Sequence, residues 1–342
     1  MSDIHIRKEG RAGRITLTRT RTLNALSHTM CRDIDAALID WRDDESVALV
    51  IIDAEGEKAF CAGGDVAEVQ RAGTAGNYKL GRDFWRDEYR MNARLAEYPK
   101  PVFAFMQGFV MGGGVGLGCH VSHRVVGDTV QMAMPECGIG LIPDVGGTLL
   151  LSAAPGRLGE FLGLTGARMG AGDAIRAGFA DRYLPEADWP EAIAALCETG
   201  LAEALPVRPA PAPEFAQGAI DTAFAADRVP GIIAAVDAAS ELAAAGKALA
   251  RGSPLSMACT LEMVRAQRGD SDIRSALRRE FRFTWRSMDR GDFLEGVRAQ
   301  IIDKDRTPRW QHPGPEAVTT AEVAAMLAPL GDNDLTFEEE AS

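Results

Sequence analysis

Glu136 and Asp144 are the two carboxylates whose positions best suit catalysis. Glu136 follows an apolar segment and precedes a glycine-rich stretch. Asp144 comes eight residues later, between Pro143 and a glycine pair. Two carboxyl groups that face one small pocket titrate as a coupled pair, and one of them keeps its proton to higher pH. Such a pair supplies a base or nucleophile and an acid near neutral pH. The alternative for each is a loop residue that binds local backbone N–H groups.

Two glycine-rich segments, residues 59–65 and 111–117, carry the second signal. Glycine lets a backbone approach a ligand closely and adopt a positive φ at no steric cost. A glycine turn that opens a helix also directs unpaired N–H groups outward, where the helix dipole adds positive potential. One N–H from each segment can then hold an oxygen that becomes negative in a transition state. Close helix packing is the alternative, whereas the spacing fits neither common nucleotide-phosphate motif.

These segments also carry a resemblance, together with residues 134–136, 143–147, 164–168, 291–299 and 302–306. On them the chain resembles the crotonase (enoyl-CoA hydratase/isomerase) superfamily, and more narrowly its 3-hydroxyisobutyryl-CoA hydrolases. The likeness spans roughly residues 10–310. It implies an α/β fold, with a spiral of ββα turns followed by a helical C-terminal region.

The resemblance also implies roles for individual residues. The N–H groups of Gly64 and Gly113 are expected to form an oxyanion hole for the thioester carbonyl. Glu88 is expected to reach the acyl group, with a solvated helix face as its alternative. The residues expected along the coenzyme A arm are Asn24, Ala25 and Leu26.

Two further charged positions remain open. Asp65 is expected to cap the helix that follows the first glycine segment. Arg19 and Arg21 precede the segment that would contact coenzyme A, and they either contact its phosphates or lie in water.

The residue type at position 116 bears on whether the chain resembles a hydratase or a thioester hydrolase. Hydratases of this superfamily use two glutamates; one corresponds to Glu136, but the other falls at Gly116. Where those hydratases have a glycine, this chain has Asp144. Both departures favour thioester hydrolysis, with 3-hydroxyisobutyryl-CoA, an intermediate of valine breakdown, as the expected substrate. Glu136 would either attack the thioester carbonyl or activate water. An enoyl-CoA hydratase/isomerase and a catalytically silent CoA-binding protein are the alternatives.

Strands and helices, the elements that must position these residues, alternate along the first part of the chain. Apolar, β-branched runs predict strands at residues 14–17, 47–53 and 102–106, and helical spacing predicts a helix over residues 30–41. Such alternation indicates α/β architecture with parallel strands. Later helices are expected at 219–251, 257–267 and 273–288. The predicted divisions are a core at 1–205, a Pro-rich connector at 206–213, a helical region at 214–330 and a disordered acidic tail at 331–342.

Composition limits the partners. The 342 residues carry a net charge of −12, which argues against nucleic acid as the main partner. Six scattered cysteines lack metal-type spacing and suggest buried, reduced thiols in a cytoplasmic protein. No apolar run is long enough to span a membrane. We expect no metal and no cofactor, because coenzyme A is part of the substrate, and leave a homo-oligomer open.

Overall fold

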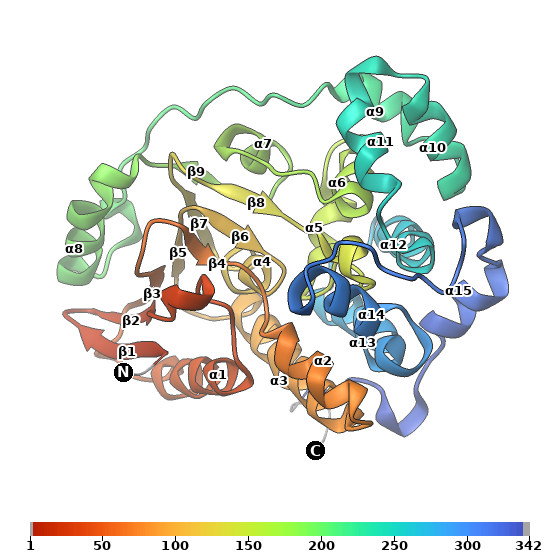
Figure 1. Cartoon of the computed structure of the whole chain (residues 1–342). Coiled ribbons are helices and arrows are strands. Elements are labelled where there is room, and N and C mark those ends of the chain that lie inside the picture. Colours follow the sequence, from red (N-terminus) through yellow and green to blue (C-terminus); the bar gives the residue numbers. More distant parts are fainter. Residues whose placement is uncertain (1–2, 338–342) are drawn as a thin grey trace. The chain divides into compact units, whose positions relative to one another are not determined.

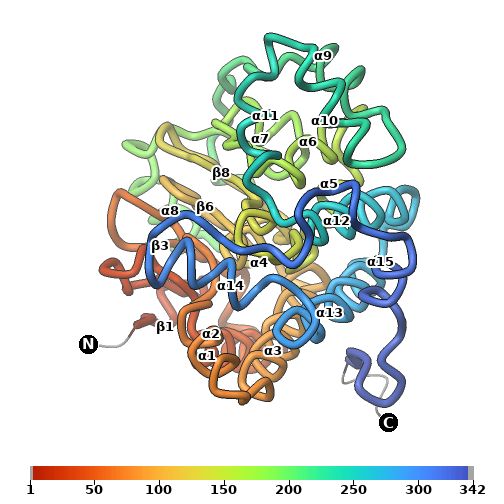
Figure 2. The backbone as a smooth tube through the Cα atoms, turned by 45° about the vertical axis from the view of Figure 1, so that its right-hand side comes forward, coloured from red at the N-terminus to blue at the C-terminus, as the bar shows by residue number. Residues whose placement is uncertain are grey.

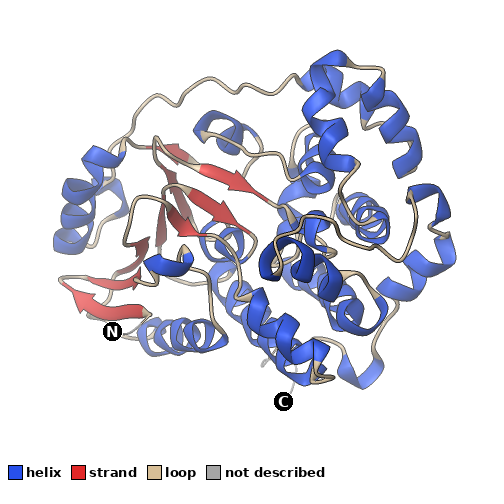
Figure 3. Cartoon of the chain, in the orientation of Figure 1, coloured by secondary structure: helices blue, strands red, loops and turns tan. Residues whose placement is uncertain are grey.

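The computed structural model describes residues 3–337 (Figure 1). These residues form two compact units. Within the described residues, one unit comprises 3–64, 87–133 and 168–214, and the other comprises 65–86, 134–167 and 215–337. The strands of the described chain belong to the first unit, and the second is built from helices (Figure 3). The predicted core at residues 1–205 therefore needs correction, because residues 65–86 and 134–167 pack with the C-terminal helices.

A six-stranded sheet is the framework of the first unit. Its order is β1-β2-β3-β5-β7-β9, and every neighbouring pair is parallel except β1 and β2. Residues 49–52 are apolar and fully buried, as expected of parallel strands covered on both faces. The parallel α/β prediction is thus confirmed. The strands are β1 (Ile4–Glu9), β2 (Ala12–Leu17), β3 (Leu49–Ala54), β5 (Val102–Met106), β7 (His123–Val126) and β9 (Arg182–Tyr183).

A smaller parallel sheet positions the glycine segments. It pairs β4 (Ala59–Cys61) with β6 (Phe109–Met111), and β6 with β8 (Gln131–Ala133). The first glycine segment continues directly from β4 and the second from β6. Because neighbouring parallel strands end at the same edge of a sheet, both segments emerge at that edge, where ligands of α/β proteins commonly bind.

Helices cover the sheets of the first unit. In α1 (His28–Arg42), the Ser27 side chain accepts a hydrogen bond from Met30 N, and the predicted apolar face is buried. Helix α8 (Trp189–Thr199) packs against the large sheet, with the Trp189 and Phe105 rings 5.4 Å apart. The other helices of the unit are α4 (Gly113–Gly118), α7 (Ala171–Arg176) and the second half of α3 (Tyr78–Ala96), which crosses the boundary between the units.

The second unit is helical around α12 (Pro254–Gln267). This helix packs against α5 (Gly147–Ala153) and α6 (Leu158–Thr165), and α13 (Ile273–Arg290) packs against α5 and α15 (Thr320–Leu327) (Figure 2). The three predicted helical stretches are confirmed, although the first is broken into several helices. The remaining helices are α2 (Val66–Thr74), α9 (Gln217–Ala223), α10 (Val229–Asp237), α11 (Ala243–Leu249) and α14 (Phe293–Val297).

The connector and the tail differ in outcome. Residues 206–213 are extended and mostly exposed, as predicted (Figure 1). The prediction of a disordered tail is wrong for residues 331–337. Asp334 pairs with Arg282 at 2.8 Å, and Leu335 and Phe337 are buried, so apolar anchors within an acidic segment hold it in place. Residues 338–342 lie outside the described residues.

Two further predictions concern the state of the cysteines and the presence of a membrane-spanning helix. All six thiols are free and buried, as predicted. Within residues 3–337, a single helix long and apolar enough to cross a bilayer is not found; one sharply bent pair, Val229–Asp237 with Ser240–Leu249, reaches that length and composition only when combined.

Candidate functional site

The two glycine turns at the edge of the small sheet bring two N–H groups close together. Gly63 has a φ of 116° and Gly112 a φ of 48°, conformations that favour glycine. Gly113 begins α4, so its N–H belongs to the unpaired first turn of a helix. A methyl group built on Gly113 would lie 3.3 Å from the nitrogen of Gly64. Neither N–H donates to another residue within 3–337, so the turns present two adjacent donors, the arrangement of an oxyanion hole.

The packing alternative holds for other glycines of the same segment. A methyl group on Gly114 would lie 2.2 Å from the carbonyl oxygen of Cys61, and one on Gly118 would lie 2.5 Å from the sulfur of Met106. These glycines let α4 approach β4 and β5. Close packing against β4 and β5 therefore accounts for Gly114 and Gly118.

Glu88 lies beside these donors. It belongs to α3, and its residue is only 3% exposed, so the solvated-face alternative is wrong. A methyl group on Gly113 would lie 2.8 Å from Glu88 Oε1. Burial raises the pKa of Cys61 to about 12, and the charge of Glu88 contributes to that rise. A carboxylate thus adjoins the paired N–H groups within the first unit.

The segment from Asn24 to Leu26 lies against the first glycine turn. Leu26 N donates to Gly63 O at 2.9 Å, and the Leu26 side chain would lie 3.3 Å from a methyl group added to Gly113. Asn24 is buried, and its amide donates at 3.0 Å to the carbonyls of Glu55 and Ala59. Asn24 therefore braces the loop with its side chain, Ala25 is half-buried, and Leu26 lines the donor pair.

The two arginines of this loop take different positions. Arg19 donates to Ala25 O at 3.0 Å and pairs with Asp3 at 3.5 Å, so it supports the loop. Arg21 is exposed, and it lines an open hollow together with Lys58 and the carboxylates of Glu55 and Glu57. Of the two, Arg21 is the one available to an anionic ligand.

In the second unit, Glu136 and Asp144 form a buried acidic pair. Their exposed fractions are 5% and 4%. Glu136 begins a single 3₁₀ turn, η2 (Glu136–Ile139), which closes at the left-handed Gly140. Burial raises the pKa of Glu136 well above its usual value, and the neighbouring Asp144 raises it further. Glu136 Oε2 is buried and accepts no hydrogen bond from the described residues.

Asp144 precedes a strained turn. Val145 has a φ of 54° and Gly146 a φ of 80°, and Gly147 N donates to Asp144 O at 2.7 Å. A positive φ is unusual for a β-branched residue, and such strain concentrates at functional sites. The turn directs the chain from Asp144 into α5.

The structure also shows where Gly116 and Asp65 lie. Gly116 lies buried inside α4, so no carboxylate is available there. Asp65 is the N-cap residue of α2, as predicted, but its side chain makes no capping hydrogen bond to that helix. No group of three or more His, Cys, Asp or Glu side chains suited to a metal occurs in the described part of the chain.

Sequence reasoning missed Glu280. This residue of α13 is fully buried and accepts hydrogen bonds from Gly146 and Thr148. Burial raises the pKa of Glu280 to about 7. The available signal was its spacing, because it lies on the apolar face of α13 with Ala276 and Leu277.

Raised carboxyl pKa values make stability depend on pH. Such a group binds more protons in the folded state, so stability falls as pH rises from the unfolded pKa near 4.5 through the folded value, which for Glu280 is about 7. Glu136→Gln removes one of these groups. We therefore expect its melting temperature to exceed the native one by a margin that grows as the pH rises from about 4.5, the unfolded pKa, through neutrality. Thermal unfolding across that range checks this, and a margin independent of pH would contradict it.

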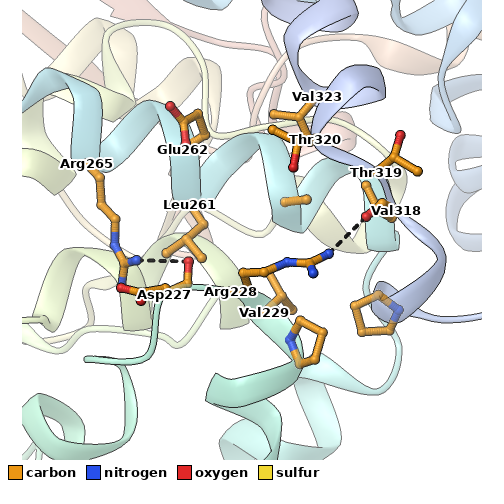
Figure 4. A pocket seen from close by; sticks show the side chains of 13 residues that line it. Asp227, Arg228, Val229, Leu261, Glu262, Arg265, Val318, Thr319, Thr320 and Val323 are labelled. Carbon is orange, nitrogen blue, oxygen red and sulfur yellow. Dashed lines mark hydrogen bonds between the residues drawn. The ribbon is translucent and has the colours of Figure 1, made fainter.

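A second hollow lies wholly within the second unit (Figure 4). Arg228 and Arg265 line it, and they donate to the carbonyls of Val318 and Asp227. It contains none of the predicted catalytic residues, so it is not the candidate reaction site.

Comparisons with known proteins show the family to which the chain belongs. The family model described as enoyl-CoA hydratase/isomerase matches residues 12–327. The mitochondrial 3-hydroxyisobutyryl-CoA hydrolase of Gallus gallus is 36% identical, over 98% of this chain and 91% of that protein.

Two solved structures cover nearly the whole chain. The enoyl-CoA hydratase from Rhodobacter sphaeroides 2.4.1 has 58% identity and a TM-score of 0.95, covering 98% of this chain and 100% of that one. The carnitinyl-CoA dehydratase from Mycobacterium thermoresistibile has 42% identity and a TM-score of 0.94, covering 99% of each. The chain therefore belongs to the enoyl-CoA hydratase/isomerase family, the crotonase superfamily.

Proposed function

We propose that this protein hydrolyses an acyl-CoA thioester, with 3-hydroxyisobutyryl-CoA as the preferred substrate and 3-hydroxyisobutyrate and CoA as products. The observation that carries the proposal is the buried pair Glu136 and Asp144, in which Glu136 retains an oxygen with no hydrogen-bond partner among residues 3–337. Burying such a carboxyl group has an energetic cost, which points to a functional role.

The proposed reaction uses these groups in sequence. Glu136 either attacks the thioester carbon to form a mixed anhydride or takes a proton from the water that attacks it. In both routes the carbonyl oxygen becomes negative, and the N–H groups of Gly64 and Gly113 stabilise it. The C–S bond then breaks, and Asp144 protonates the leaving thiolate or orients the reacting group. On the anhydride route, one water molecule then cleaves the anhydride, which releases the acid and restores Glu136.

Residues of the first unit would contact the substrate. Glu88 adjoins Gly113 and would accept a hydrogen bond from the substrate hydroxyl. The exposed Arg21 and Lys58 would face the coenzyme A phosphates from the hollow that they line.

The second candidate is hydration of an enoyl-CoA, favoured by the names of the two solved structures. Against it stands Gly116, which leaves α4 without the second glutamate that the superfamily's hydratases use. The hydrolase named among the curated relatives supports the first candidate. A silent CoA-binding protein would bind acyl-CoA and turn over none.

A substrate comparison tests the acyl group. Free thiol should be released faster from 3-hydroxyisobutyryl-CoA than from isobutyryl-CoA, which lacks only the hydroxyl. Glu88→Gln should reduce that preference several-fold, because it weakens one charge-assisted hydrogen bond. Equal rates for both substrates in the native protein would overturn the assignment of the hydroxylated substrate.

A further inference from the structure

Glu280 binds the turn that follows Asp144. Its Oε2 accepts from Gly146 N at 2.7 Å, and its Oε1 accepts from Thr148 N at 2.9 Å and from Thr148 Oγ1 at 2.5 Å. All of these groups are buried, and Glu280 and Asp144 belong to the same unit. The proposed mechanism leaves this carboxylate without a role.

The hydrogen bonds complete a helix start that lacks a cap of its own. Gly146 is the N-cap residue of α5 and offers no side chain. The first N–H groups of a helix need acceptors, and a negative charge there is stabilised by the helix dipole. Glu280 supplies both from α13, over a sequence separation of more than 130 residues.

The same contacts bear on the strained backbone. Val145 adopts a φ of 54° directly after Asp144, and a β-branched residue leaves that region unless its surroundings hold it. Glu280 binds the backbone of the residue that follows Val145. Loss of that hydrogen bond would let Val145 adopt an unstrained φ, and the Asp144 side chain would then point in another direction.

We propose that Glu280 is a positioning residue that holds the Asp144–Gly146 turn in its strained form and so sets the direction of the Asp144 carboxyl group. This inference rests on the proposed role of Asp144 in thioester hydrolysis. It predicts that most of the effect of Glu280 on catalysis depends on Asp144.

Glu280→Gln tests this, because an amide nitrogen accepts no hydrogen bond and leaves one donor of the turn unpaired. We expect kcat for thiol release from 3-hydroxyisobutyryl-CoA to fall on the order of tenfold to a hundredfold, with KM nearly unchanged. Thr148→Val removes only the hydroxyl donor and should give a smaller fall, which keeps the test valid if Glu280→Gln does not fold.

A double-mutant cycle separates positioning from general destabilisation. In an Asp144→Asn background, Glu280→Gln should cause little further loss, because the two residues act as a unit. The matched control is Glu160→Gln, which alters another fully buried carboxylate of the same unit, one that pairs with Arg157 and Arg268. Its folded fraction should retain the native kcat.

Two results would overturn the inference: native kcat in folded Glu280→Gln, or full additivity of Glu280→Gln with Asp144→Asn. Absence of thiol release in the native protein would instead sink the proposed function, so the two failures are distinguishable.

Discussion

Glu136→Gln is expected to lower kcat for thiol release from 3-hydroxyisobutyryl-CoA by about 10²- to 10⁴-fold, with a small change in KM. The amide keeps the shape of the side chain but can neither attack a carbonyl as a carboxylate does nor take a proton from water. Because Glu136 is 5% exposed and one of its oxygens has no hydrogen-bond partner in the described chain, the substitution removes a buried charge without breaking a bond at that oxygen.

We therefore expect Glu136→Gln to lose activity and to retain its stability. Asp292→Asn is a suitable control, since Asp292 is 2% exposed and belongs to the same unit but binds Ser253 and Gln311. It should cost stability and leave kcat of the folded protein near native. Substantial hydrolysis by folded Glu136→Gln would remove Glu136 from the mechanism.

Gly113→Ala is expected to lower kcat by about 10²- to 10³-fold. The backbone of Gly113 does not have a positive φ, so alanine is conformationally allowed and strain does not explain the loss. The added methyl would instead lie 2.8 Å from Glu88 Oε1 and 3.3 Å from Gly64 N, where it displaces the carboxylate and obstructs the donor pair.

Gly170→Ala is the matched control in the same unit. Gly170 also lacks a positive φ, and an added methyl there would meet no atom within 4 Å. Steady-state kinetics should show native kcat for this control and a selective kcat loss for Gly113→Ala. If both variants hydrolyse the substrate equally well, the Gly113 N–H does not stabilise the transition state.

Periodicity and local chemistry predicted the elements that depend on nearby residues. The strand at 102–106 and the helix around Ile34 and Leu38 follow from apolar spacing, because burial of one face selects that pattern. The glycine turns were also predictable, since positive φ and close approach leave few alternatives to glycine.

Long-range contacts explain what the sequence could not predict. Residues 65–86 and 134–167 pack with helices more than 70 residues away, and no local pattern reports such partners. Glu280 was missed for the same reason, because its donors lie more than 130 residues away. The tail was misjudged from its charge, although Leu335 and Phe337 anchor it. The roles of Glu136 and Asp144 came from the family resemblance, whereas burial and the raised pKa of Glu136 came from the structure.

Cleavage of the thioester, instead of addition of water to a double bond, is the reaction proposed for this member of the family. Its most direct test is the product distribution from equal concentrations of 3-hydroxyisobutyryl-CoA and crotonyl-CoA, followed by free-thiol release and by mass spectrometry of the CoA esters. We predict free CoA from 3-hydroxyisobutyryl-CoA and no hydrated ester from crotonyl-CoA. Accumulation of 3-hydroxybutyryl-CoA from crotonyl-CoA without thiol release from either substrate would contradict this proposal.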